Sequence, residues 1–186
     1  MEKLAPTDRT TNGPFDVSEI GLLTPYLDFG SIRVSPSPMM QIRADVEDAS
    51  KRLVAITLEI EGHRVQLQAF AASKTEGLWG PTIENIESAL ASQGGSSQRF
   101  EGELGIEIAA QVPFEENGTR VIRESRFIGV DGPKWFLRGV LTGPELHLSS
   151  RREPLIAAFR AVAVSRGETP MPPGELLPLA LPGVQA

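Results

Sequence analysis

The sequence predicts an α+β fold built around a mainly antiparallel sheet, with helices and terminal segments covering both faces of the sheet. Residues 53–71 and 104–112 alternate apolar with polar side chains, which is the period of a strand. Residues 81–93 repeat apolar side chains with the period of a helix. Residues 126–143 are apolar on both sides of the expected strands, as strands are when each face is covered.

Strand signals dominate the first part of the chain. Strands are expected over 27–34 and 40–46, on either side of a link whose prolines cannot donate to a ladder. The alternating residues of 53–60 and 65–71 predict a hairpin that turns at Glu61-Gly62-His63.

The segment that follows carries the signals of an amphipathic helix. Pro81 suits the first turn and Thr82 a cap, and Gly94-Gly95 ends the segment. The apolar positions recur at helical spacing and are Ile83, Ile86 and Leu90. We therefore expect this helix to lie on the sheet.

A second hairpin is expected around Asn117-Gly118, because this dipeptide is the strongest short signal for a two-residue turn. Centring the turn there places Glu115 opposite Arg120, which is a favourable cross-strand pair of opposite charges. The return strand is expected over 122–130.

The stretch 126–143 is expected to turn at 131–134 and to pair with itself. This register places Val130 opposite Trp135 on one face and Phe127 opposite Arg138 on the other. It also places Gly129 opposite Phe136, where the bare backbone leaves room for the ring.

The remaining elements complete the predicted organisation. A helix is expected over 153–160 and a closing strand over 162–164. We expect a poorly ordered arm over 1–25, one domain over 26–167 and a proline-rich tail over 168–186 that is extended and packed on the domain.

Composition excludes several kinds of function. The chain has no cysteine, which excludes disulfides, thiol nucleophiles and thiolate metal sites. The net charge of −6 disfavours nucleic acid and anionic lipid as partners, although Arg120, Arg123 and Arg126 give one expected strand a basic face. No run of residues is long and apolar enough for a membrane span or a secretion signal, so we expect a cytoplasmic protein.

The sequence offers few groups for catalysis or metal binding. The two histidines, His63 and His147, are expected in a turn and a polar loop, both in solvent and without other metal ligands at suitable spacing. The run "SQGGSS", residues 92–97, follows a helix, so it is at the wrong end of that helix to hold a phosphate. We therefore predict no metal and no cofactor.

One candidate ligand site remains, formed by Trp79, Trp135, Phe136 and Arg138. The aromatic residues could provide a platform for a ligand, or they could simply be core. Arg138 could bind an anion in a pocket beside Phe136. It could instead cover Phe127 with its stem while its guanidinium reaches solvent or pairs with Glu76 or Glu107.

Several stretches resemble an actinobacterial protein family known as domain of unknown function 3710. The most specific are "RFIGVDGPKWFLRG" and "PMPPGELLPL", and the resemblance spans residues 27 to 182. It implies no activity, substrate or site residue. The order of elements is also similar, at the level of the fold alone, to the α/β/α sandwich of Mog1/PsbP-like proteins.

These observations favour a non-enzymatic module that binds a protein partner or a small ligand. The alternative is an enzyme that uses arginine and carboxylate chemistry in a cleft near Trp79 and Arg138. A proline-rich tail that binds a partner instead of its own domain is a further alternative.

Overall fold

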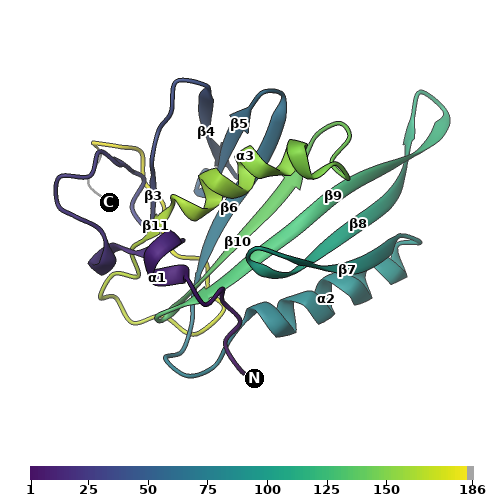
Figure 1. Cartoon of the computed structure of the whole chain (residues 1–186). Helices are drawn as coiled ribbons and strands as arrows, with labels where there is room; N and C mark the ends of the chain where they lie inside the picture. The colour runs from purple at the N-terminus through teal and green to yellow at the C-terminus, as the bar shows by residue number, and fades with distance from the viewer. Residues whose placement is uncertain (184–186) are drawn as a thin grey trace.

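The computed structural model describes residues 1–183 and has an α+β fold with two sheets (Figure 1). The main sheet is antiparallel and has seven strands in the order β4-β5-β6-β10-β9-β8-β7. Their bounds are β4 Met40–Val46, β5 Leu53–Ile60, β6 His63–Ala71, β7 Ser96–Gly102, β8 Gly105–Glu116, β9 Thr119–Gly132 and β10 Trp135–Thr142. The small sheet has the order β1-β11-β3-β2, with β1 Phe15–Asp16, β2 Leu27–Asp28, β3 Ile32–Val34 and β11 Ala163–Val164.

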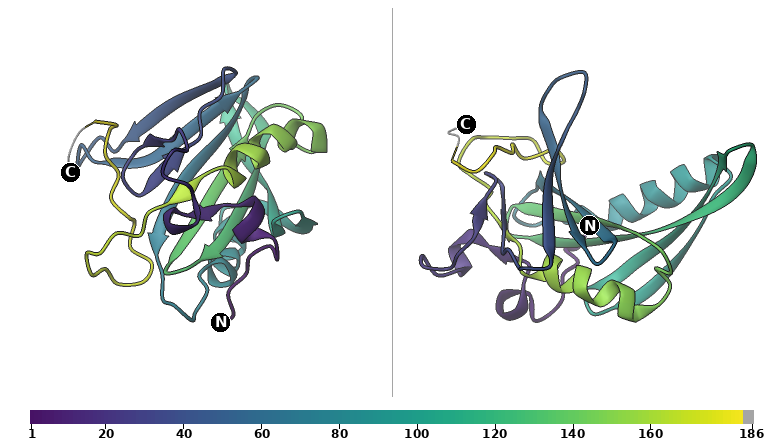
Figure 2. Two further views of the ribbon diagram at one scale, coloured as in Figure 1. Left: turned by 60° about the vertical axis from the view of Figure 1, so that its left-hand side comes forward. Right: turned by 90° about the horizontal axis from the view of Figure 1, so that it is seen from above.

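Helices lie on opposite faces of the main sheet (Figures 1 and 2). Helix α2, Trp79–Ser92, packs on β7, β8 and β9, and α3, Ser149–Arg160, packs on β5, β6 and β10. We call these the α2 face and the α3 face of the sheet. The short helices α1, Arg9–Asn12, and η1, Val17–Glu19, lie before and after β1 of the small sheet.

The two hairpins predicted from their turn residues are confirmed. Strands β5 and β6 join at Glu61-Gly62, and β8 and β9 join at Asn117-Gly118. All four turn residues have positive φ, as the tight turns of hairpins require. Glu115 lies opposite Arg120 as expected.

The ribbon formed by β9 and β10 is buried on both faces over most of its length. Ile128, Val130 and Leu137 are at most 1% exposed on the α3 face, and Phe136 is 2% exposed on the α2 face. The double cover ends toward Thr142, which is exposed. The ribbon is therefore a core element whose far end reaches the surface.

The predicted register of this ribbon is wrong by two residues. Trp135 pairs with Gly132 and Leu137 with Val130, because the turn consists of Pro133-Lys134 alone. A shift of two keeps every side chain on its expected face, so the burial pattern survives the change.

Asp131 explains why the turn is shorter than expected. Its side chain is 3% exposed, and its carboxylate accepts hydrogen bonds from the amides of Leu78 at 2.8 Å and Leu4 at 2.9 Å. The amide of Trp79 also donates to it at 3.2 Å. Asp131 thus caps α2 from another element, whereas the predicted cap Thr82 lies inside the helix and donates to the carbonyl of Leu78.

Gly129 leaves room for an aromatic ring, as expected, but mainly for the ring of Trp79 and less for that of Phe136. A Cβ atom built there would overlap the Trp79 ring first and Phe136 second. The indole of Trp79 lies against the strand at this point and donates through Nε1 to the carbonyl of Ile106 at 2.9 Å. Close packing of α2 on the sheet therefore depends on this glycine.

Two predicted strands differ from the structure. Residues 27–34 form the separate strands β2 and β3, which pair with each other because the chain reverses at Gly30, where φ is 87°. The predicted closing strand lies in the small sheet, between β1 and β3.

The terminal segments lie against the sheets. Leu176 pairs with Phe70 on β6, Leu179 pairs with Gly30, and Leu177 is 1% exposed. At the other end, Met1 accepts a hydrogen bond from the amide of Gly77. The division into arm, domain and tail stays a prediction, and residues 184–186 of the predicted tail lie outside the described residues.

Cover on the α2 face is uneven along the main sheet. Helix α2 lies over β7, β8 and β9, whereas Arg43, Arg64 and Gln66, whose side chains are on the α2 face of β4 and β6, are exposed. The α+β class and the mainly antiparallel sheet are confirmed. The finer likeness to an α/β/α sandwich of the Mog1/PsbP type stays a prediction.

Candidate functional site: an open strand edge

The four residues proposed from sequence do not form one site. Trp135 is fully buried in the core on the α3 face, where its Nε1 donates to Asp16 at 2.9 Å. Trp79 and Phe136 lie on the α2 face, with ring centroids 5.8 Å apart. All three aromatic side chains are at most 2% exposed, so they present almost no surface to a ligand.

Arg138 is separated from Trp79 by two phenylalanine rings. The ring of Phe136 stacks on that of Phe70, and the guanidinium of Arg138 lies 5.3 Å from the Phe70 centroid. Its Nη2 donates to Oε1 of Gln68, not to the expected Glu76 or Glu107. Burial lowers the pKa of Arg138 from its ordinary value. Ligand binding at these four residues stays a prediction.

Glu107 has a different partner, Arg126. The two side chains form an ion pair in which both residues are 4% exposed, and the guanidinium lies 4.6 Å from the Phe100 ring centroid. The predicted basic strand face is therefore wrong. Arg126 is buried and paired, and Arg123 is on the opposite face from Arg120 and Arg126.

The histidines also differ from each other. His147 is exposed as expected, but His63 is 5% exposed and donates through Nε2 to the carbonyl of Pro144 at 2.7 Å. The expectation that His63 lies in solvent is wrong, because the turn is shorter than predicted and His63 begins β6. Among residues 1–183 no group of three His, Cys, Asp or Glu side chains is arranged to hold a metal ion.

An opening in the main sheet is the feature that sequence reasoning missed. Strand β9 has 14 residues and β10 has 8, and their pairing stops at Arg126 and Leu141. The preceding residues of β9 pair with β8 on one side only. Figures 1 and 2 show this β8–β9 hairpin extending beyond the neighbouring strands.

The direction of the free backbone groups follows from the two hairpins. Residues that flank a two-residue turn exchange both hydrogen bonds, and along each strand the bonding side then alternates. Counting forward from Thr119, the odd-numbered residues of β9 form backbone hydrogen bonds with β8. Counting back from Gly132, the even-numbered residues form backbone hydrogen bonds with β10. The N–H and C=O groups of Arg120, Ile122 and Glu124 therefore point to the side that β10 leaves open.

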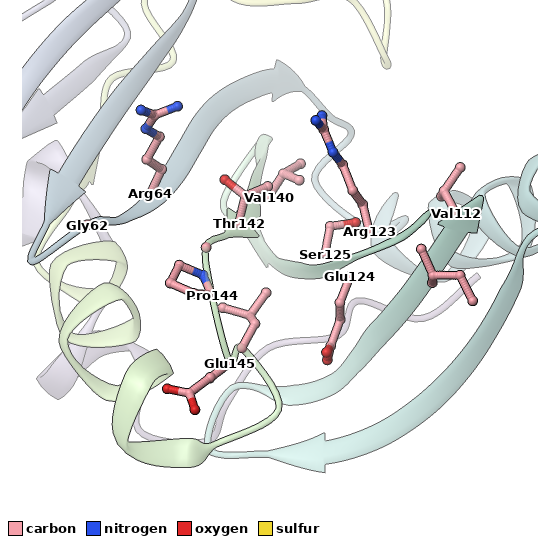
Figure 3. A pocket seen from close by; sticks show the side chains of 13 residues that line it. Gly62, Arg64, Val112, Arg123, Glu124, Ser125, Val140, Thr142, Pro144 and Glu145 are labelled. Atoms are coloured by element: carbon pink, nitrogen blue, oxygen red, sulfur yellow. The ribbon is translucent and has the colours of Figure 1, made fainter. Parts of the chain in front are cut away.

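A groove of about 800 Å³ lies at this opening (Figure 3). Strand β9 forms one side, and the end of β10 with the start of β6 forms the other. The lining residues used below are Arg64, Ile122, Arg123, Glu124, Thr142, Glu145 and Leu146. Strand β10 leaves the sheet here at Gly143, where φ is 144° and the ring of His63 fills the space that a side chain would need.

Charges of opposite sign line the groove on opposite faces of the sheet. Figure 3 shows Arg64 and Arg123 pointing one way and Glu124 and Glu145 the other. Arg64 pairs with Glu59 at 3.0 Å and Glu145 with Arg151 at 3.3 Å. Within residues 1–183, Arg123 and Glu124 form no ion pair, although Arg123 lies 3.7 Å from the ring centroid of Phe114.

The signal that could have revealed the groove is a difference in strand length. The Asn117-Gly118 turn fixes where β9 begins, and Gly143-Pro144 marks where β10 ends. Counted from the turn at Pro133-Lys134, β9 is longer than β10. The first part of β9 therefore extends past the end of β10 and has no partner on that side.

The fold and the groove define an α+β protein with a mainly antiparallel sheet, in which the first part of β9 pairs with β8 but has no partner on its other side within the described part of the chain. The chain belongs to the family described as "Protein of unknown function (DUF3710)", whose model matches residues 13–186. No curated protein and no solved structure matches the chain. None of the helices within residues 1–183 is long and apolar enough to cross a membrane.

Proposed function

We propose that this protein is a non-enzymatic interaction module that binds an extended segment of a partner protein along the open edge of β9. The observation that supports this most strongly is the set of outward-facing backbone groups at Arg120, Ile122 and Glu124 beside a groove. A strand added there would take the place that β10 leaves vacant. Backbone hydrogen bonds would supply affinity, and alternate side chains would supply specificity.

The dimensions of the opening suit a short segment. The outward-facing backbone groups lie within five residues, 120–124, of the unpaired part of β9, and at ~3.4 Å per residue these extend over about 17 Å. Ile122, at the middle of this edge, is 69% exposed and offers an apolar contact to such a segment. Native proteins usually protect free edges with charge or short length, and an edge of this length is suited to pairing.

Proline at position 122 tests the proposal. Because the Ile122 amide points away from β8, Ile122→Pro removes a donor at the open edge and leaves the β8–β9 ladder intact. The experiment selects linear peptides from a random displayed library on the wild-type protein, then measures their affinity by fluorescence anisotropy. We expect Ile122→Pro to weaken binding about tenfold or more, since it removes a hydrogen bond and places a ring in the path of the strand.

Ile122→Ala is the matched control, because it removes the same side chain and keeps the amide. It should retain binding within about threefold, which corresponds to loss of a partly exposed apolar contact. Equal affinity of wild-type and Ile122→Pro proteins for every selected peptide would contradict the proposal.

A further inference from the structure

The groove also specifies the charge pattern of its partner, a step that rests on the proposed function. Arg123 and Glu124 are neighbours in sequence, so the pleat of β9 sends their side chains to opposite faces of the sheet. A partner strand beside β9 has the same pleat, and its successive side chains would meet these two faces in turn.

Each face of the groove has one dominant charge. On the α2 face, the groove is lined by Arg123 of β9 and Arg64 of β6, and Thr142 of β10 lies between these two strands. On the α3 face, Glu124 and Glu145 line it with the apolar side chains of Ile122 and Leu146. The ion pairs that Arg64 and Glu145 already make reduce their attraction for a ligand, which leaves Arg123 and Glu124 as the main determinants.

We infer that the partner is an extended protein segment in which an acidic residue is next to a basic residue. The acidic side chain lies opposite Arg123 and the basic side chain lies opposite Glu124. The pair at Arg123 is a non-hydrogen-bonded pair, because the backbone of Arg123 bonds to β8, and side chains approach most closely in such pairs. Like charges at either position would repel, so the edge also rejects segments of the wrong pattern.

Charge reversal at position 123 tests this inference. For peptides selected on the wild-type protein, Arg123→Glu is expected to reduce affinity about tenfold, because an attractive cross-strand pair becomes a repulsive one. Replacing the acidic residue of the peptide by lysine should restore the affinity for Arg123→Glu and lower it for the wild type, so that the two changes are coupled.

Arg43→Glu provides the matched control. It changes the net charge by the same amount on the same face of the main sheet, but Arg43 is an exposed residue of β4 that does not line the groove. Its effect on peptide affinity should be less than about twofold at 0.15 M salt, where distant charges are screened.

The outcomes separate the two proposals. If selected peptides lose affinity for Ile122→Pro but not for Arg123→Glu, the edge binds a strand and the inferred charge pattern is overturned. If no selected peptide depends on Ile122, the proposed function itself fails. A wild-type protein that dimerises with increasing concentration, with Ile122→Pro remaining monomeric in light scattering, would make a second copy of this chain the occupant and would also overturn the inference.

Discussion

Replacing Asp131 by alanine is expected to lower the free energy of unfolding by about 3 to 5 kcal/mol, because three backbone amides lose their acceptor in a buried site. The amides belong to Leu4, Leu78 and Trp79, so the substitution affects the N-terminal segment, α2 and β9 together. The loss combines an absent helix cap with unsatisfied donors. Equilibrium unfolding in urea measures it directly.

Asp131→Asn is the informative companion variant. Asparagine keeps one oxygen for the amides of α2 but places an NH2 group where the second carboxylate oxygen faces Leu4. We expect an intermediate loss of about 1 to 2 kcal/mol. A stability change below about 0.5 kcal/mol for Asp131→Ala would show that water replaces the carboxylate without cost and that the cap is unimportant.

The second large effect is expected at Glu107. Glu107→Leu leaves the guanidinium of Arg126 buried without its partner, and breaking a buried pair in this way costs about 3 to 5 kcal/mol. Replacing both charged residues of the pair should restore most of the lost free energy of unfolding. The double variant Glu107→Leu, Arg126→Met is therefore predicted to unfold at a urea concentration close to that of the wild type.

Glu59→Gln is the control for this pair, because Glu59 bonds to Arg64 on the surface. An exposed ion pair of this kind contributes about 1 kcal/mol at most. The account of the buried pair would be contradicted if Glu107→Leu and Glu59→Gln had equal effects on stability.

Local signals were sufficient for much of the fold. The turn dipeptides at Glu61-Gly62 and Asn117-Gly118 set the register of two hairpins, because short turns fix the pairing of the strands they join. The apolar spacing of Ile83 and Leu90 identified α2, and both side chains are buried. Such features depend on neighbours within a few residues, which the sequence displays directly.

Features that depend on distant partners were not predictable in the same way. The β9–β10 register differs from the expected one because Asp131 is held by an amide 53 residues away in the chain. Gly129 accommodates Trp79 from α2, not only the neighbouring Phe136. Residues 27–34 split into two strands at Gly30, which also contacts Pro178 and Leu179, residues nearly 150 positions away in the chain.

The candidate site also has features that the sequence displays directly and features that it does not. The aromatic residues and Arg138 were predicted as a site from their large and distinctive side chains, but the three aromatic residues are buried in the core. The open edge consists of backbone groups at Arg120, Ile122 and Glu124, and backbone groups have no sequence signature of their own. Only the relative lengths of β9 and β10 expose them.

Residue-resolved hydrogen exchange of the β9 amides tests the central claim most directly. In the free protein, we expect the amides of Ile122 and Glu124 to exchange rapidly and those of Val121 and Arg123, which bond to β8, to exchange slowly. Saturation with a selected peptide should slow Ile122 and Glu124 and leave Val121 and Arg123 nearly unchanged. Slow exchange of Ile122 and Glu124 in the free protein, or no change on saturation, would contradict the assignment of β9 as an open, strand-binding edge.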